Sequence, residues 1–271
     1  MSRPDDCFVD PESLAFRMKA RWFRDVLAHP PARRYLWSLY HAGEAYEALH
    51  PDGIFVERLP DPLLRRQLAR HLTDETRHAT VFRALLSEEG AALLPLEPVE
   101  DVGWHLLTHV VPDVVERSRR PGSFDEETTV RYMAFLHVLE LRSIGDLCAL
   151  VEAARLAGEP ALAARLGTIL PDERFHATYT HRAARRLSTG PAQFRTVMEE
   201  MVRAERRHMT ECLLRITGRF EALGAAPRDG WGRLRWRAMR AAAQIGLGLP
   251  LLPVYDRVPG RFLPGEKGEA A

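Results

Sequence analysis

Cysteine is scarce in this chain of 271 residues. Its three cysteines, Cys7, Cys148 and Cys212, lie far apart, and no Cys-x-x-Cys pair occurs. This distribution argues against a disulfide framework, a zinc ribbon and a rubredoxin-type iron module. It fits a reducing compartment, and the polar first ten residues lack the apolar core of a signal peptide. We therefore expect a cytoplasmic protein.

A charge excess of one sign and long apolar runs are lacking too. The 38 Lys and Arg residues nearly balance the 37 Asp and Glu residues, which gives a formal net charge of +1. A general nucleic-acid binder is normally more basic, so nucleic acid is not an expected partner. The longest apolar stretch, residues 241–255, is interrupted by Gln244, Pro250 and Pro253. It is shorter than the roughly 18–20 residues of a membrane-spanning helix.

Strand-like alternation of polar and apolar residues is also lacking, whereas helical periodicity runs through nearly the whole chain. Clusters of Pro and Gly mark the expected helix ends. The pattern predicts an all-α fold with Asp61 and Ser123 as N-caps. The expected helices cover residues 11–28, 32–50, 61–87, 102–118 with a kink at Pro112, 124–156, 161–187 with a kink or break at Pro171, and 192–223.

The chain divides into three parts. Residues 1–30 form a lead-in helix, and residues 31–224 carry the helical core with its fifth long helix. Residues 225–271 form an extension rich in Arg, Trp and apolar residues, with a poorly ordered end. The extension could lie on a membrane surface, or it could pack against the helices and close a site. Its Gly and Pro residues favour packing.

Two heptapeptides nearly repeat each other 98 residues apart. Residues 74–80 read DETRHAT, and residues 172–178 read DERFHAT. The period is too long for a solenoid repeat and suits two helical hairpins related by pseudo-symmetry. Each copy contains Glu-x-x-His, which places both side chains on one face of a helix. The two pairs are Glu75 with His78 and Glu173 with His176.

A glutamate on an earlier helix precedes each pair. Glu44 lies 31 residues before Glu75, and Glu140 lies 33 residues before Glu173. Two antiparallel helices joined by a short loop bring such positions to the same height. The result is four carboxylates and two imidazoles, the ligand set of a dinuclear carboxylate site in a four-helix bundle. Four carboxylates neutralise two divalent cations, and these ligand types suit iron or manganese.

These motifs resemble the ferritin-like di-iron carboxylate superfamily over residues 32–187. The sequence AGEA around Glu44 is similar to rubrerythrins, while DETRH and DERFH are similar to ribonucleotide reductase small subunits and bacterial multicomponent monooxygenases. The resemblance implies a ferritin-like four-helix bundle with a crossover helix and additional N- and C-terminal helices. It also implies six catalytic metal ligands, which are Glu44, Glu75, His78, Glu140, Glu173 and His176.

An aspartate precedes each Glu-x-x-His pair. The resemblance implies that each aspartate hydrogen-bonds the histidine of the opposite copy, so that Asp74 reaches His176 and Asp172 reaches His78. Such contacts would fix the tautomers and strengthen the ligands.

Other residues leave alternatives open. Glu47 competes with Glu44, or pairs with His50 at a helix end. Glu205 and His208 lie in a run of arginines that favours a solvated face, although a ligand from the fifth helix is not excluded. Tyr40 and Tyr179 are candidates for redox-active or metal-neighbouring tyrosines. Residues expected either in the core or at the border of a substrate cavity are Trp37, Tyr40, Phe135, Leu139, Phe175 and Tyr179.

The favoured function is an O2-activating oxidase or oxygenase with two Fe, or Mn and Fe. It would hydroxylate, desaturate, N-oxygenate or oxidise an aldehyde or acyl group of a small apolar or amphipathic substrate. An external ferredoxin or reductase is the expected electron donor, because the chain has no flavin or iron–sulfur motif. The alternatives are a rubrerythrin- or ferritin-like ferroxidase or peroxide scavenger, and a non-catalytic helical scaffold. A homodimer and peripheral membrane contact stay open.

Overall fold

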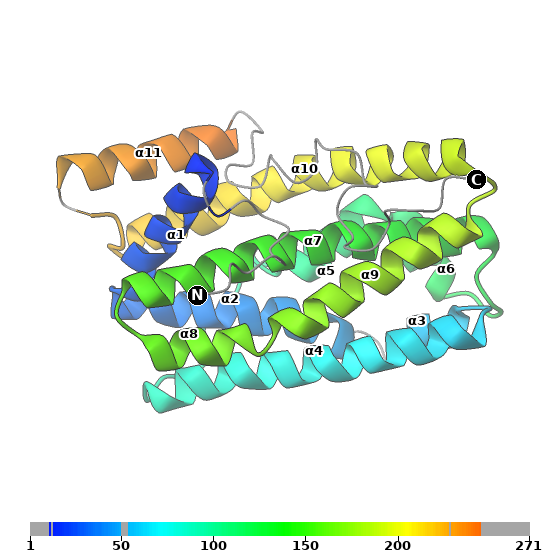
Figure 1. Cartoon of the computed structure of the whole chain (residues 1–271), viewed down its shortest axis with the longest axis horizontal. Coiled ribbons are helices and arrows are strands. Elements are labelled where there is room, and N and C mark those ends of the chain that lie inside the picture. Colours follow the sequence, from blue (N-terminus) through cyan, green and yellow to red (C-terminus); the bar gives the residue numbers. More distant parts are fainter. Residues whose placement is uncertain (1–10, 12, 50–53, 228, 245–271) are drawn as a thin grey trace.

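The computed structural model describes residues 11, 13–49, 54–227 and 229–244 (Figure 1). These residues form helices and connecting turns without a strand, so the all-α prediction is confirmed. None of the described helices is both long and apolar enough to cross a membrane. The helices are α1 (Leu14–Leu27), α2 (Pro30–Leu49), α3 (Ile54–Arg58), α4 (Pro62–Glu88), α5 (Val102–Val110), α6 (Pro112–Ser118), α7 (Glu126–Leu156), α8 (Pro160–Gly167), α9 (Leu170–Leu187), α10 (Pro191–Ala222) and α11 (Gly230–Gln244).

Two helical hairpins form the centre of the molecule. α2 packs along α4, α7 packs along α9, and α4 contacts α9 (Figure 1). The short helices α5 and α6 lie in the connection between the hairpins, and α10 packs against α5 and α7. This arrangement brings α2, α4, α7 and α9 together, while the narrower expectation of a ferritin-like bundle stays a prediction.

α7 is the most enclosed helix, because it contacts α1, α8, α9 and α10. Four consecutive residues, Met133, Ala134, Phe135 and Leu136, are all buried, so side chains on every side of the helix are covered. Apolar residues all round a helix are typical of such burial. The N-cap is Asp125 rather than the predicted Ser123, since the Asp125 carboxylate accepts a hydrogen bond from the Thr128 backbone N–H.

Prolines set two of the helix breaks. α5 ends at Val110, and Pro112 begins α6, as the sequence predicts. The helix expected over residues 161–187 is split near Pro171, as the sequence predicts. The break falls at Thr168 and Ile169, and Pro171 lies in the first turn of α9. A first turn tolerates proline because the missing N–H has no intrahelical partner there. The short helix α3 was not predicted.

The C-terminal extension packs against the helices in its described part. α11 contacts α10 and α1. Trp236 is 2% exposed, with its ring 5.5 Å from that of Trp22, and Arg235 forms an ion pair with Asp25. Trp231 on the same helix is 80% exposed. The packed arrangement favoured by the sequence is therefore observed for α11, while residues 245–271 lie outside the described residues.

These two tryptophans provide a matched test of the packing of α11. Trp236→Ala removes a buried indole and should lower the free energy of unfolding by about 3 kcal/mol. Trp231→Ala removes an exposed one and should change it by less than about 0.5 kcal/mol. Urea unfolding followed by circular dichroism measures both. Equally small effects would mean that α11 is not held against α1 and α10.

Candidate metal centre

The structure brings the six predicted ligands together in the interior, from α2, α4, α7 and α9. Together with His71, they form two adjacent groups that share Glu75, and within each group the ligand atoms lie within 4.8 Å of one another. Each group could hold a metal ion. The first consists of Glu44, Glu75, His78 and Glu173, and the second of His71, Glu75, Glu140 and His176.

His78 is the central side chain of the first group. Its Nδ1 lies 3.3 Å from a carboxylate oxygen of Glu44, 3.2 Å from one of Glu173 and 3.7 Å from one of Glu75. The imidazole is fully buried, and Glu75 and Glu173 are almost fully buried. Three carboxylates from three helices therefore face the same ring nitrogen.

The second group is built around two parallel imidazole rings. His176 Nδ1 lies 3.1 Å from Glu75 and 3.9 Å from Glu140. His71 Nε2 lies 3.3 Å from Glu75 and 3.1 Å from Glu140. The two rings stack with their centroids 3.7 Å apart. Both available nitrogens thus point at the same pair of carboxylates.

The aspartates lie where the resemblance implies. His78 Nε2 is 3.5 Å from Asp172, and His176 Nε2 is 3.5 Å from Asp74. Each contact crosses from one copy of the duplicated motif to the other. In both contacts the aspartate lies next to Nε2 of the histidine, so that Nδ1 faces the glutamate ligands. Contacts of this kind fix the tautomer of a ligand histidine and raise its basicity.

Sequence reasoning missed His71. It precedes Glu75 by four residues and therefore shares its face of α4. Its Nδ1 lies 2.9 Å from the Tyr179 hydroxyl, which orients the ring and leaves Nε2 for the centre. The available signal was the pattern His-x-x-x-Glu-x-x-His. The duplication concealed it, because the position 98 residues further on is Ile169.

Two further histidines tie the ligand helices together and were also missed. His41 Nδ1 lies 2.9 Å from the backbone carbonyl of Ala79, and His137 Nδ1 lies 2.9 Å from that of Ala177. The first histidine precedes Glu44 by three residues and the second precedes Glu140 by three. The duplication therefore extends to His-x-x-Glu, which a comparison of α2 with α7 could have found.

Burial dominates the electrostatics of the centre. It raises the pKa of Glu44 well above the ordinary carboxyl value, and the nearby Glu75 charge adds to this. Burial likewise raises the pKa of Glu140. Burial alone would lower the pKa of His78, but the adjacent carboxylates of Glu173 and Glu44 raise it well above its usual range. Without a cation, protons on these groups relieve the repulsion between the carboxylates.

Unpartnered buried atoms converge on the centre. Within the described residues, one carboxylate oxygen of Glu75, one of Glu173, and the Nδ1 atoms of His78 and His176 make no hydrogen bond. Buried polar atoms without partners are costly. Because these atoms are oxygen and nitrogen donors of the kind that bind divalent metals, the residues present fit a metal centre.

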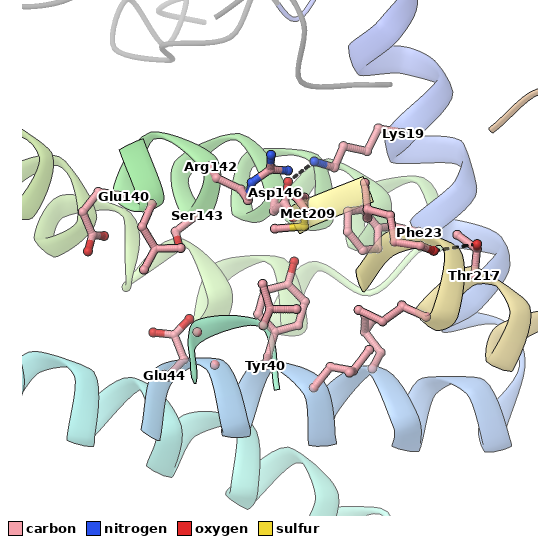
Figure 2. Close-up of a pocket in the computed structure, with 18 of the residues that line it drawn as sticks. Lys19, Phe23, Tyr40, Glu44, Glu140, Arg142, Ser143, Asp146, Met209 and Thr217 are labelled. Carbon is pink, nitrogen blue, oxygen red and sulfur yellow. Dashed lines mark hydrogen bonds and ion pairs between the residues drawn. The ribbon is translucent and has the colours of Figure 1, made fainter. Parts of the chain in front are cut away.

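A cavity of about 180 Å³ reaches the centre (Figure 2). Its wall includes Glu44, His71, Glu75 and Glu140, together with residues of α1, α5 and α10. In Figure 2, Glu44 and Glu140 lie at one end and Lys19 lies at the other. The sequence did not predict which residues of α1, α5 and α10 line the cavity, because no local pattern relates these distant segments.

Only Tyr40 and Leu139 of the six residues considered for the cavity line it. Trp37 instead stacks on Phe82, and its indole N–H donates to Glu89. Phe135 is a buried core residue, Phe175 lies beneath the Arg70 guanidinium, and Tyr179 contacts His71. None of these four side chains belongs to the cavity wall.

The surface interpretation of Glu205 is wrong. Glu205 is 1% exposed and forms an ion pair with Arg142 of α7. That guanidinium, 63 residues away in sequence, compensates the buried charge. Glu205 does not belong to either ligand group, and His208 is half-buried at another place. The alternative pair Glu47 and His50 lies outside the described residues, apart from the backbone of Glu47 in α2.

Comparisons with protein-family models, curated proteins and solved structures gave no match for this chain. The chemistry of the centre therefore has to be inferred from its own residues and their geometry.

Metal binding and pH should be coupled in a defined direction. The raised pKa values of Glu44 and Glu140 mean that the folded, metal-free chain keeps protons that the unfolded chain releases above the ordinary carboxyl range. These groups make the metal-free protein less stable as pH rises towards their folded pKa values. Divalent ions replace those protons, so the rise in Tm caused by Mn²⁺ should grow between about pH 5 and about pH 8. Thermal denaturation at several pH values measures this, and a constant shift would contradict it.

The aspartate contacts can be tested separately. Asp172→Asn removes the negative charge next to His78 Nε2 and should weaken metal binding about 10- to 100-fold. Asp113→Asn is the matched control, because Asp113 is an exposed residue that pairs with Arg131 away from the centre. Competition against a chromophoric chelator gives the affinities. Equal affinities for both variants would remove Asp172 from the centre.

Proposed function

We propose that this chain is an O2-activating dinuclear iron oxidase or oxygenase that acts on a small apolar or amphipathic molecule. The observation that carries the proposal is the contact between two His/Glu groups, joined through Glu75, and a largely apolar cavity. Glu44, His71, Glu75 and Glu140 belong both to these groups and to the cavity wall. A molecule in the cavity would therefore lie directly beside the centre.

The donor set supports iron or manganese. Carboxylate oxygens and imidazole nitrogens suit both metals, and neither group contains a thiolate. Two ferrous ions would supply electrons to dioxygen beside a C–H or N–H bond of the substrate. Glu75 would contact both ions. Glu44, His78 and Glu173 would complete one ligand group, and His71, Glu140 and His176 would complete the other.

The polar atoms of the cavity wall support an amphipathic substrate. Trp22 Nε1, the Tyr40 hydroxyl and Arg142 Nη1 are buried hydrogen-bond donors without a hydrogen-bond partner among the described residues. Buried donors of this kind favour a ligand that brings acceptor oxygens. The substrate we propose has an apolar body and a polar end that accepts hydrogen bonds, such as a carboxylate or a carbonyl group.

The ion pair between Lys19 and Asp146 lies in the cavity wall away from the ligand groups (Figure 2). Asp146 follows Glu140 by six residues on α7, which corresponds to about 9 Å along the helix. A substrate with its polar end near Lys19 and Asp146 would place atoms about 9 Å away beside the carboxylates.

Tyr40 is suited to hold the substrate rather than to give up its proton. Burial raises the pKa of the Tyr40 hydroxyl, and the nearby Glu44 raises it further. The hydroxyl therefore stays protonated at neutral pH. It can donate a hydrogen bond to a ligand oxygen in the cavity, one helical turn from Glu44.

A ferroxidase or peroxide scavenger and a non-catalytic scaffold are the competing functions. Neither requires an apolar cavity joined to the ligand groups, which is why we favour a substrate-transforming enzyme. Electrons for repeated turnover would come from an external ferredoxin or reductase.

The sharing of Glu75 gives a direct test of a dinuclear centre. Glu75→Ala should abolish binding of both Mn²⁺ equivalents, because Glu75 belongs to both groups. Glu44→Ala should lose one equivalent and keep the other, since Glu44 belongs to one group only. Equilibrium dialysis with elemental analysis gives the counts. The same count in both variants, with circular dichroism showing intact folding, would contradict the shared ligand.

The activity is tested by adding oxygen to anaerobically Fe²⁺-loaded protein. We expect oxygen uptake and an optical change whose decay is accelerated by amphipathic carboxylates, aldehydes or amines. Oxygenated, desaturated or cleaved organic product, measured by mass spectrometry, would support the enzyme. Iron oxidation that no organic molecule affects would instead support a ferroxidase, and absence of bound metal would support a scaffold.

A further inference from the structure

A third group of ligand-type side chains lies between α5 and α10. His105, His208 and Glu211 each place one ligand atom within 4.8 Å of the others. His105 comes from α5, whereas His208 and Glu211 come from α10. The group shares no residue with either ligand group of the interior centre.

Helical spacing explains how two short segments build this group. His208 and Glu211 are three residues apart and therefore share one face of α10. His105 and His109 are four residues apart and share one face of α5. The His109 ring lies 4.1 Å from the His105 ring and 5.2 Å from the His208 ring, measured between centroids. Three imidazoles and a carboxylate thus meet where the two helices pack.

His105 carries the observation that points to a ligand. The residue is 7% exposed, and its Nε2 makes no hydrogen bond among the described residues. The carboxylate of Glu211 lies 3.6 Å from this nitrogen, beyond hydrogen-bonding distance. A buried ring nitrogen is thus directed at a carboxylate and a second imidazole without bonding to either.

The imidazoles of this group favour the neutral form. Burial lowers the pKa of His105, and His109 and His208 lower it further. Burial and His109 likewise lower the pKa of His208. Neutral imidazole keeps a lone pair for a metal ion, whereas the protonated ring has none.

We propose that His105, His208 and Glu211 bind a divalent transition-metal ion such as Zn²⁺, with His109 as an adjacent fourth donor. Two imidazoles and one carboxylate form a set that binds zinc and ferrous iron in proteins. Glu211 and His109 are exposed and His208 is half-buried, so an ion has access from solvent. The site is independent of the function proposed for the interior centre.

Such an ion would join two walls of the cavity. Val102 and Gly103 of α5 and Met209 and Leu213 of α10 line it, next to the ligand positions on the same helices. A metal bound between α5 and α10 would hold these segments at a fixed separation. Because only the folded chain brings the three ligands together, binding would also stabilise the fold.

The number of Zn²⁺ ions bound per chain tests this site. Comparing variants distinguishes zinc bound here from zinc bound at the interior centre. His208→Ala should bind one Zn²⁺ fewer than the wild type. The same substitution in a Glu75→Ala background, which disables the interior groups, should again remove one equivalent. His29→Ala, a half-buried histidine on another segment, is the control and should match the wild type. Equilibrium dialysis followed by elemental analysis gives the counts.

A second measurement keeps the test decisive if Glu75→Ala fails to fold. Zn²⁺ at about 100-fold above its Kd should raise the Tm of wild-type protein through this site, and His208→Ala and Glu211→Ala should each reduce the rise by about 5 °C. Wild-type zinc counts and Tm shifts in both variants would overturn the proposal. Loss of one equivalent with a reduced shift would support it, whatever happens at the interior centre.

Discussion

Four carboxylates in the interior of a helical protein are the constraint on which the rest of this structure depends. Glu75, Glu140 and Glu173 are nearly inaccessible to solvent, and Glu44 is only partly accessible. Buried like charges repel one another and lose their hydration, so the helices can hold them together only if something neutralises them. The raised pKa values of Glu44 and Glu140 describe neutralisation by protons. Two divalent ions would neutralise the same four charges, and they would also use the unpartnered ring nitrogens.

The duplicated motif provides two kinds of contact that hold these charges in place. His41 and His137 each bond to a carbonyl of the other helix in their own hairpin, and so fix α2 to α4 and α7 to α9. The aspartates before the Glu-x-x-His pairs make contacts between the hairpins, from α4 to α9 and from α9 to α4. In each hairpin, a histidine therefore joins the two helices, and an aspartate joins that hairpin to the other one. The duplicated sequence thus produces equivalent contacts in both hairpins.

The sequence is informative where a contact depends on spacing within one helix. The long helices, the Glu-x-x-His faces and the convergence of six ligands could be predicted from period and loop length. His71 was missed because the ligands were chosen from residues that recur in both copies of the duplicated motif. The residue equivalent to His71 in the second copy is Ile169. Glu205 was misplaced because its local neighbours are arginines, whereas its partner Arg142 comes from another helix. Tertiary contacts of this kind leave no mark on local periodicity.

The residues that line the cavity could also be predicted only in part from the sequence. Tyr40 and Leu139 could be found because they lie within a turn of predicted ligands, but Lys19 and Trp22 come from α1 and have no spacing relation to the centre. Trp37 and Phe175 lie close in sequence to ligands and yet contact Phe82 and Arg70 instead. The position of a side chain relative to a ligand on its own helix therefore does not decide which neighbouring helix it contacts.

The two hairpins contribute matching Glu, Glu and His ligands, to which α4 alone adds His71, and their surroundings differ. The cavity reaches Glu44, His71, Glu75 and Glu140 and does not include Glu173, His78 or His176 in its wall. α4 continues unbroken through His71, whereas the equivalent chain is interrupted between α8 and α9. The elements that complete the cavity, α1, α5 and α10, lie outside the two duplicated hairpins. A duplicated pair of hairpins can therefore supply a nearly symmetric set of ligands. In the proposed function, these additional helices would make one side of the centre accessible to a molecule and determine which molecule fits.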